Sequence, residues 1–183
     1  MEEKEIDEYL RKMKDFFISK DIPSLKILSN ELVRRNFVEQ DKFISKLSLL
    51  AYAFFKILGK ERIQKSEKWF EIKDALVTQL EHAIELSTTK EHLDALISDL
   101  LNTVEKFDLE TSAYFRSVIA HGRIKHATLL YSFGVSIDKA ADLYDVSSAE
   151  LLDYVGGTKT HDMFIPSKEV FKRFKSIEKA LEE

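Results

Sequence analysis

Apolar residues recur at every third or fourth position along most of the chain, which is the spacing of amphipathic α-helices. The chain has neither glycine nor proline between Lys60 and His121, and this favours long helices over strands and hairpins. The apolar stripes predict helices over residues 3–19, 23–35, 41–59, 61–86, and from 88 to a break at Asp108. We therefore expect an all-α fold, with a multi-helix bundle as its main part.

Residues 41–59 are expected to form the centre of this bundle, because they leave little polar surface on any side. Asp41 can cap the helix at its start, and Gly59 closes it. Thr88, followed three positions later by Glu91, has the form of a capping box for the next helix.

The predicted elements become shorter after Asp108, and this change divides the chain. A helix near residues 111–133, interrupted or weakened at Gly122, precedes two short helices at 137–144 and 147–155 that Ser136 and Ser147 can cap. A polar link then leads past Pro166 to an amphipathic terminal helix. We predict an N-terminal bundle (1–108), a helix-turn-helix unit (109–157), and a link with a C-terminal helix (158–183).

The composition excludes several classes of protein. Of the 183 residues, 44% are hydrophobic and 33% are charged, which is typical of a folded globular chain. The absence of cysteine excludes disulfides, thiolate metal sites and a cysteine nucleophile. The longest apolar run, residues 47–55, falls far short of the roughly 20 residues that span a bilayer, and the first residues lack the features of a secretory signal. We expect a cytoplasmic protein with no membrane partner.

Metal-binding and cofactor-binding signatures are absent from the sequence. No two of the five histidines lie four positions apart, as a helical zinc site requires, and no Glu-x-x-His pair typical of a di-iron bundle occurs. The chain also has no glycine-rich phosphate loop. We therefore expect neither a metal nor a small-molecule cofactor.

Residues 137–155 have the pattern of a helix-turn-helix. Ala141 is small enough to let two helices cross closely, and Tyr144 and Val146 flank the predicted turn. Leu151 and Tyr154 supply the apolar positions expected on the second helix. The segment therefore predicts a packed trihelical unit together with the helix before it.

The phrase Ala-Ala-x-x-Tyr-x-Val-Ser is a frequent form of this unit, here with Asp145 where glycine is commonest. Aspartate also adopts the left-handed backbone conformation, so the turn tolerates the exchange. Over about residues 118–181 the chain resembles small helix-turn-helix proteins classed as antitoxins, in which a tail helix follows a glycine and a short link. This resemblance implies a non-enzymatic regulator or adaptor, and it leaves the first hundred residues without an assigned role.

Two kinds of partner stay open for this unit. Its second helix would present Ser147, Ser148, Glu150 and Asp153, and residues 135–156 hold one lysine against five acids, a net charge of −4. Lysine and arginine contacts to phosphates supply most non-specific DNA affinity, so this charge favours a protein partner or a second copy of the chain. DNA remains possible through basic residues on the flanks: Arg116, Arg123, Lys125, Lys139 and Lys159.

An enzyme is the alternative interpretation. Arg116 and His121 lie five positions apart, which is similar to the Arg-x(4–6)-His motif of HEPN-type ribonucleases. That resemblance implies metal-independent cleavage of RNA at a dimer interface. In such a site the neutral histidine takes the proton of a ribose 2′-hydroxyl, and the arginine stabilises the charged phosphorane.

Overall fold

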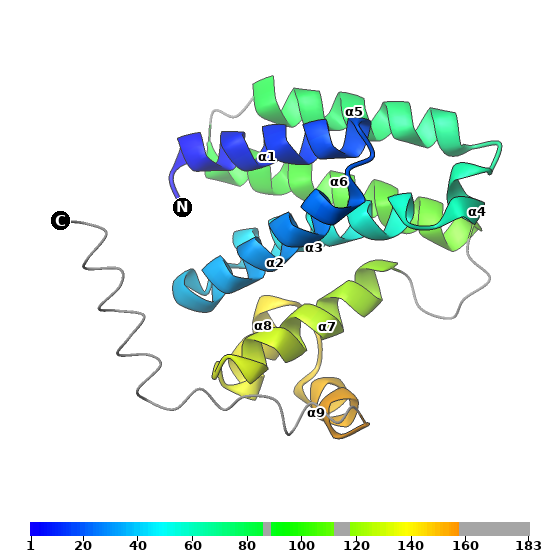
Figure 1. The fold of residues 1–183 in the computed structure, drawn as a ribbon. Coiled ribbons are helices and arrows are strands. Elements are labelled where there is room, and N and C mark those ends of the chain that lie inside the picture. The colour runs from blue at the N-terminus through cyan, green and yellow to red at the C-terminus, as the bar shows by residue number, and fades with distance from the viewer. Residues whose placement is uncertain (86–88, 112–117, 158–183) are drawn as a thin grey trace.

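A computed structural model describes residues 1–85, 89–111 and 118–157, and every regular element among them is a helix (Figure 1). The predicted all-α fold is confirmed for this part of the chain. The helices are α1 (Glu3–Ile18), α2 (Ile22–Glu39), α3 (Lys42–Leu58), α4 (Glu61–Gln64), α5 (Trp69–Glu85), α6 (Lys90–Thr111), α7 (Val118–Ser132), α8 (Ile137–Leu143) and α9 (Ser148–Gly157). The predicted C-terminal helix lies outside the described residues.

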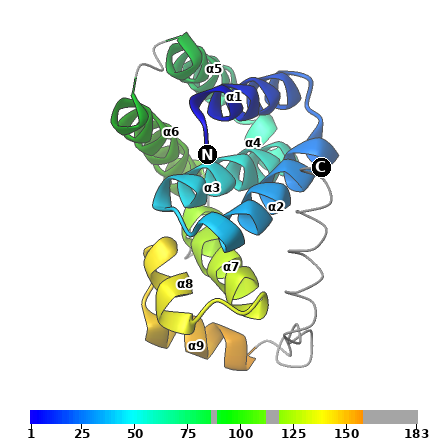
Figure 2. The ribbon, with the colours of Figure 1, turned by 90° about the vertical axis from the view of Figure 1, so that its left-hand side faces the viewer.

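The helices form three tiers that can be followed in both ribbon views (Figures 1 and 2). Helices α1, α5 and α6 make one outer tier, α2 and α3 lie in the middle, and α7, α8 and α9 make the other outer tier. The α7–α9 unit packs on the middle tier mainly through α7, which contacts both α2 and α3.

Helix α3 lies at the centre, as the sequence predicted, and 13 of its 17 residues are buried. On the side of α1 and α5 its packing is aromatic. The Phe54 ring lies 4.5 Å from that of Phe17, which in turn lies 6.3 Å from Trp69. Asp41 caps the helix by accepting a hydrogen bond from the backbone N–H of Phe43 at 2.9 Å, which confirms the predicted start.

The single helix predicted over residues 61–86 is wrong, because the chain turns between α4 and α5. Ile63 and Trp69 are both buried, yet six residues of continuous helix would turn their side chains roughly 120° apart. A turn held by the Ser66 hydroxyl, which donates to the Ile63 carbonyl at 2.8 Å, brings both side chains into the core. Burial of two large side chains therefore overrides the helical preference of the intervening residues.

Asp108 does not end a helix, contrary to the sequence prediction, since α6 continues to Thr111. Its carboxylate is 1% exposed and accepts the backbone N–H of Val118, the first residue of α7, at 2.5 Å. Lys60 lies 3.5 Å from the same carboxylate. A buried acid at a helix start offsets the positive end of the helix dipole, so Asp108 joins α6 to α7.

Helix boundaries elsewhere shift by a few residues from the predictions. Helix α2 runs four residues beyond the predicted end and stops at Gln40, whose φ of 50° is left-handed. The cap of α6 is Thr89, whose hydroxyl accepts the N–H of His92 at 3.3 Å, whereas the predicted Thr88 lies outside the described residues. Ser136 caps α8 as predicted, accepting from Lys139 N.

Gly122 neither interrupts nor ends α7, contrary to one of the two predicted possibilities. A Cβ at this position would lie 2.8 Å from Cδ1 of Tyr52 and 3.2 Å from Leu49, closer than real contacts allow. Glycine is therefore required here because α7 passes close to the aromatic ring of Tyr52 on α3.

Candidate functional site

Two of the basic residues predicted to contact a partner, Arg123 on α7 and Lys139 on α8, are held by neighbouring acids, whereas Lys125 on α7 forms no ion pair among the described residues. Arg123 donates from Nη1 to Oδ2 of Asp145 at 3.1 Å and to the Tyr144 carbonyl at 3.3 Å. Lys139 Nζ lies 3.8 Å from Asp142 Oδ2. The same two aspartates also receive Lys42 from α3, so the positive charges of Arg123 and Lys139 are largely neutralised.

The two serines predicted to contact a partner also have internal roles. The Ser147 hydroxyl accepts the backbone N–H of Glu150 at 3.0 Å, which caps α9, and the Ser148 hydroxyl donates to Asp138 at 2.7 Å. Asp145 has a φ of 50°, the left-handed conformation that the sequence predicted for the turn between α8 and α9. These serines therefore order the turn, and their side chains are already engaged.

The residues of the predicted ribonuclease pair are not both described. Arg116 lies outside the described residues, as does Lys159. His121 is exposed on α7, with its ring 6.4 Å from that of Tyr154 on α9. The geometry of an Arg–His pair is therefore not tested.

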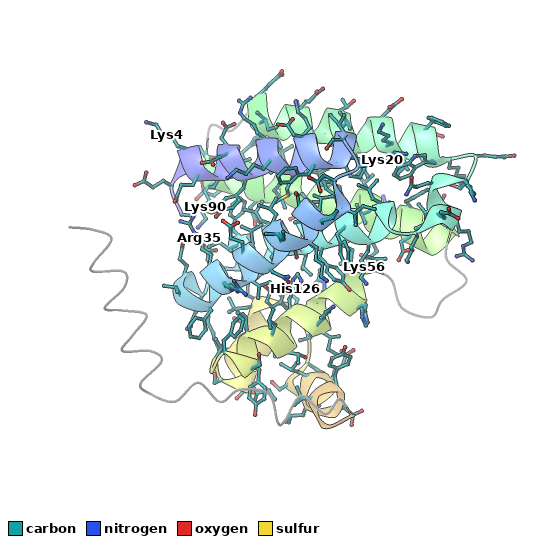
Figure 3. The ribbon with its side chains drawn as sticks, viewed as in Figure 1. Lys4, Lys20, Arg35, Lys56, Lys90 and His126 are labelled. Carbon is teal, nitrogen blue, oxygen red and sulfur yellow. The ribbon has the colours of Figure 1, made fainter. Side chains whose placement is uncertain are left out.

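The structure brings together a different set of polar side chains, which are buried where α7 meets α2 and α3. His126 on α7 is 2% exposed, and Figure 3 shows it pointing toward the middle tier. Its Nε2 lies 3.3 Å from the Ser29 hydroxyl of α2, and its Nδ1 lies 3.2 Å from the Ser48 hydroxyl of α3. One imidazole thus joins three helices.

Burial lowers the pKa of His126 from 6.5 to about 3, with a smaller contribution from the charge of Lys125. The ring is therefore neutral near pH 7, donating from one nitrogen and accepting at the other. Each serine hydroxyl also has a backbone carbonyl within reach: Ser29 reaches the carbonyl of Ser48, and Ser48 reaches the carbonyl of Ser45. For either tautomer, one serine must turn its proton toward the imidazole, so hydroxyl orientation and ring tautomer are coupled.

The network continues from Ser48 to the end of α8 and to the end of α2. The Tyr144 hydroxyl lies 3.0 Å from the Ser48 hydroxyl. Because Ser48 uses its one proton on either the Ser45 carbonyl or His126, we assign Tyr144 as the donor. Asn36 donates to the Ser45 hydroxyl at 2.7 Å. Burial raises the pKa of Tyr144 to about 12, so its proton stays in place.

Next to this network is a pocket of about 220 Å³ between α2, α3, α7 and α9. Its lining combines buried and exposed polar groups with aromatic and aliphatic surface: Lys26, Ser29, Asn30, Tyr52, Phe55, Lys125, His126, Thr128, Leu129, Ser132 and Tyr154. Typical drug-sized ligands occupy pockets of roughly 300–1,000 Å³, so this one suits a smaller molecule. No acidic side chain lines it.

Tyr52 is the unusual member of this lining. Its side chain is 4% exposed, and its hydroxyl has no hydrogen-bond partner among the described residues. Burial raises its pKa to about 12, so the group remains a protonated donor near pH 7. Buried polar atoms are nearly always paired, and an orphaned donor beside a pocket is a feature that calls for a ligand or an unusual role.

Three lysines surround Tyr52 with no acid to balance them. Lys56 and Lys125 lie 5.5 and 5.7 Å from the centre of its ring, and Lys26 lines the same pocket. In the part of the chain that the structure describes, none of the three forms an ion pair. Burial lowers the pKa of Lys56, and the neighbouring charges of Lys125, Lys60 and Lys26 lower it further.

Sequence reasoning missed this site, although a weak signal was present. Ser45, Ser48 and Tyr52 recur at helical spacing within an otherwise apolar segment, and Ser29 and Asn36 share a face of α2. In the sequence, His126 is one of five histidines, each of which we interpreted as a surface or packed residue. Only the tertiary fold brings it to its partner Ser29, which lies 97 positions earlier in the chain.

Comparison with other proteins adds no assignment: no family model, no curated protein and no solved structure matches this chain. None of the helices in the described ranges is long and apolar enough to cross a membrane. Within the same ranges, no three His, Asp or Glu side chains are grouped as a metal site would require.

Proposed function

We propose that this chain is a non-enzymatic regulator or adaptor of the cytoplasm that engages a protein partner through its α7–α9 unit, used as a helix-turn-helix. The left-handed turn at Asp145 and the small, buried Ala141 of α8 support that interpretation of the unit. The N-terminal bundle then serves as the support on which the unit is held by α7.

The observation that carries the choice of a protein over DNA is the pairing of Arg123 with Asp145 and of Lys139 with Asp142. DNA affinity depends on cations that are free to replace counterions at phosphates, and these side chains are already balanced by carboxylates. Leu152, which is 54% exposed on α9, adds an apolar contact to an acidic surface. A partner with a basic rim and an apolar centre fits this chemistry.

A substitution on α9, compared with a matched one on the opposite tier, tests this proposal. Leu152→Asp and Phe70→Asp each place a charge at an exposed apolar position, and Phe70 lies on α5 with 75% of its side chain exposed. In affinity capture from the organism of origin, a specific partner should be retained by the wild type and by Phe70→Asp, and lost with Leu152→Asp.

The same preparations distinguish the other partners. Light scattering shows whether the chain forms a dimer. If the wild type is a dimer and Leu152→Asp is a monomer, the partner at this surface is a second copy of the chain and not a different protein. Binding of duplex DNA at low salt that weakens in Lys139→Ala would overturn the choice of a protein partner. The ribonuclease hypothesis gains no support from the described residues, and loss of RNA cleavage in His121→Ala would be needed to revive it.

A further inference from the structure

The pocket beside Tyr52 has a chemistry that the adaptor role does not use. Two of its features point to a ligand independently of each other: a buried hydroxyl donor without a partner, and two lining lysines, with Lys56 close by, that no acid neutralises. Burying a donor unpaired and clustering like charges are both unfavourable in the free protein. A negatively charged acceptor would relieve both at once.

We propose that this pocket binds a small organic oxyanion, a carboxylate or a phosphate monoester carried on a flat apolar body. The acid group lies among Lys26, Lys125 and the Tyr52 hydroxyl, where donors and positive charge converge. The apolar body lies against Phe55, Leu129 and Tyr154. The proposal goes beyond the adaptor function and stands without it, since it uses neither Leu152 nor the ion pairs of Arg123 and Lys139.

The size and lining of the pocket limit the ligand. A volume of about 220 Å³ accommodates a compact molecule with one acid group and little more than a single ring. Phe55 and Leu129 are half-buried and offer apolar surface next to polar Ser29, Asn30 and Ser132. Lys26 and Lys125 are exposed whereas the Tyr52 side chain is buried, so the acid group lies between the exposed cations and the buried hydroxyl. The apolar body lies beside it, against the half-buried Phe55 and Leu129.

The Tyr52 hydroxyl is buried in the free protein, so neighbouring side chains must move for an oxyanion to reach it. Lys125 lies across the tyrosine ring and is exposed, so it can rotate away at small cost. The ring itself is fixed, because it packs on His126 at 5.1 Å and against Gly122. The donor is thus held in place while the cations adapt.

Calorimetric titration of the full-length chain tests this inference with three probes of similar shape. Benzoate and phenyl phosphate carry the proposed acid groups, and benzamide is a neutral analogue of benzoate. Both anions should bind saturably, and benzamide should bind about tenfold more weakly or worse, because the contacts of the acid group with charged donors are lost. The tighter of the two anions identifies the acid group as carboxylate or phosphate.

Three variants assign the site. Lys125→Ala and Tyr52→Phe should each weaken binding of the better anion, Lys125→Ala by about tenfold, while Lys12→Ala on α1 leaves it unchanged. Circular dichroism confirms that each variant is folded. The proposal is overturned if neither anion binds at millimolar concentration, if benzamide binds as tightly as benzoate, or if both pocket variants bind like the wild type.

Discussion

Helix α3 separates two interiors of opposite character. Toward α1, α5 and α6 it presents Phe54, which continues through Phe17 and Trp69 to Phe107 as a chain of aromatic contacts. Toward α2, α7 and α8 it presents Ser45, Ser48 and Tyr52: Ser48 and Tyr52 contact the imidazole of His126, and Ser45 accepts a hydrogen bond from Asn36. The first interior stabilises the fold by excluding water. The second makes stability depend on pH through His126, and it leaves the Tyr52 hydroxyl without a hydrogen-bond partner among the described residues.

The largest expected effect lies in the aromatic interior. Phe54→Ala removes a fully buried ring and should lower the free energy of unfolding by about 3–5 kcal/mol, because it costs both burial and a cavity. Phe70→Ala is the matched control, since Phe70 is 75% exposed and its loss should change stability by less than about 0.5 kcal/mol. Urea unfolding followed by circular dichroism measures both, and equal losses would contradict the assigned burial.

The polar interior should make the free energy of unfolding depend on pH. The unfolded chain binds a proton at His126 near the ordinary pKa of 6.5, whereas the folded chain does so only near 3. Between these values the unfolded state holds more protons, so stability falls as pH falls, by at most ~1.4 kcal/mol per pH unit from this residue.

Two variants separate this pH effect from the rest of the protein. From pH 6.5 to about pH 5 the wild type should lose roughly 2 kcal/mol through His126. His126→Gln should flatten that loss, and Phe54→Ala should keep it despite its lower stability. If the free energy of unfolding of His126→Gln falls with pH as steeply as that of the wild type, a group other than His126 binds the proton.

The smallest effect distinguishes two tyrosines that pack against the same imidazole, Tyr52 at 5.1 Å and Tyr144 at 5.5 Å. Tyr144→Phe removes a donor from Ser48 and should cost about 1 kcal/mol of unfolding free energy. Tyr52→Phe removes a hydroxyl that has no partner and should leave stability unchanged or slightly increased. Thermal unfolding of the two variants is the check, and an equal loss in both would show that Tyr52 is hydrogen-bonded in solution.

The aromatic interior was predictable because its signal is periodic and local. Ile6, Leu10 and Met13 recur at helical spacing, and all three are buried. The turn at Asp145 was also predictable, since the need for a left-handed residue follows from the short connection itself. The break between α4 and α5 was not, because it depends on where Ile63 and Trp69 must meet the core.

The polar interior was not predictable for a related reason. A serine on an apolar helix looks the same in sequence whether it faces solvent or a buried histidine, and the partners here come from helices far apart in the chain. Arg123 and Lys139 were chosen as contact residues for their charge, but their acidic neighbours are brought to them by the turn between α8 and α9 and by α8 itself. Charge counted along a chain therefore says little about charge available on a surface.

The central claim is that α3, α2 and α7 enclose a neutral imidazole in a polar interior. Nitrogen NMR of histidine-labelled protein between pH 7 and about pH 4 tests it most directly, with the His126 signal assigned as the one missing from His126→Gln. That signal should keep the shifts of a neutral ring across the whole range, because burial holds its pKa at about 3. Titration of the same signal near pH 6.5 would show a ring open to water and would contradict the account.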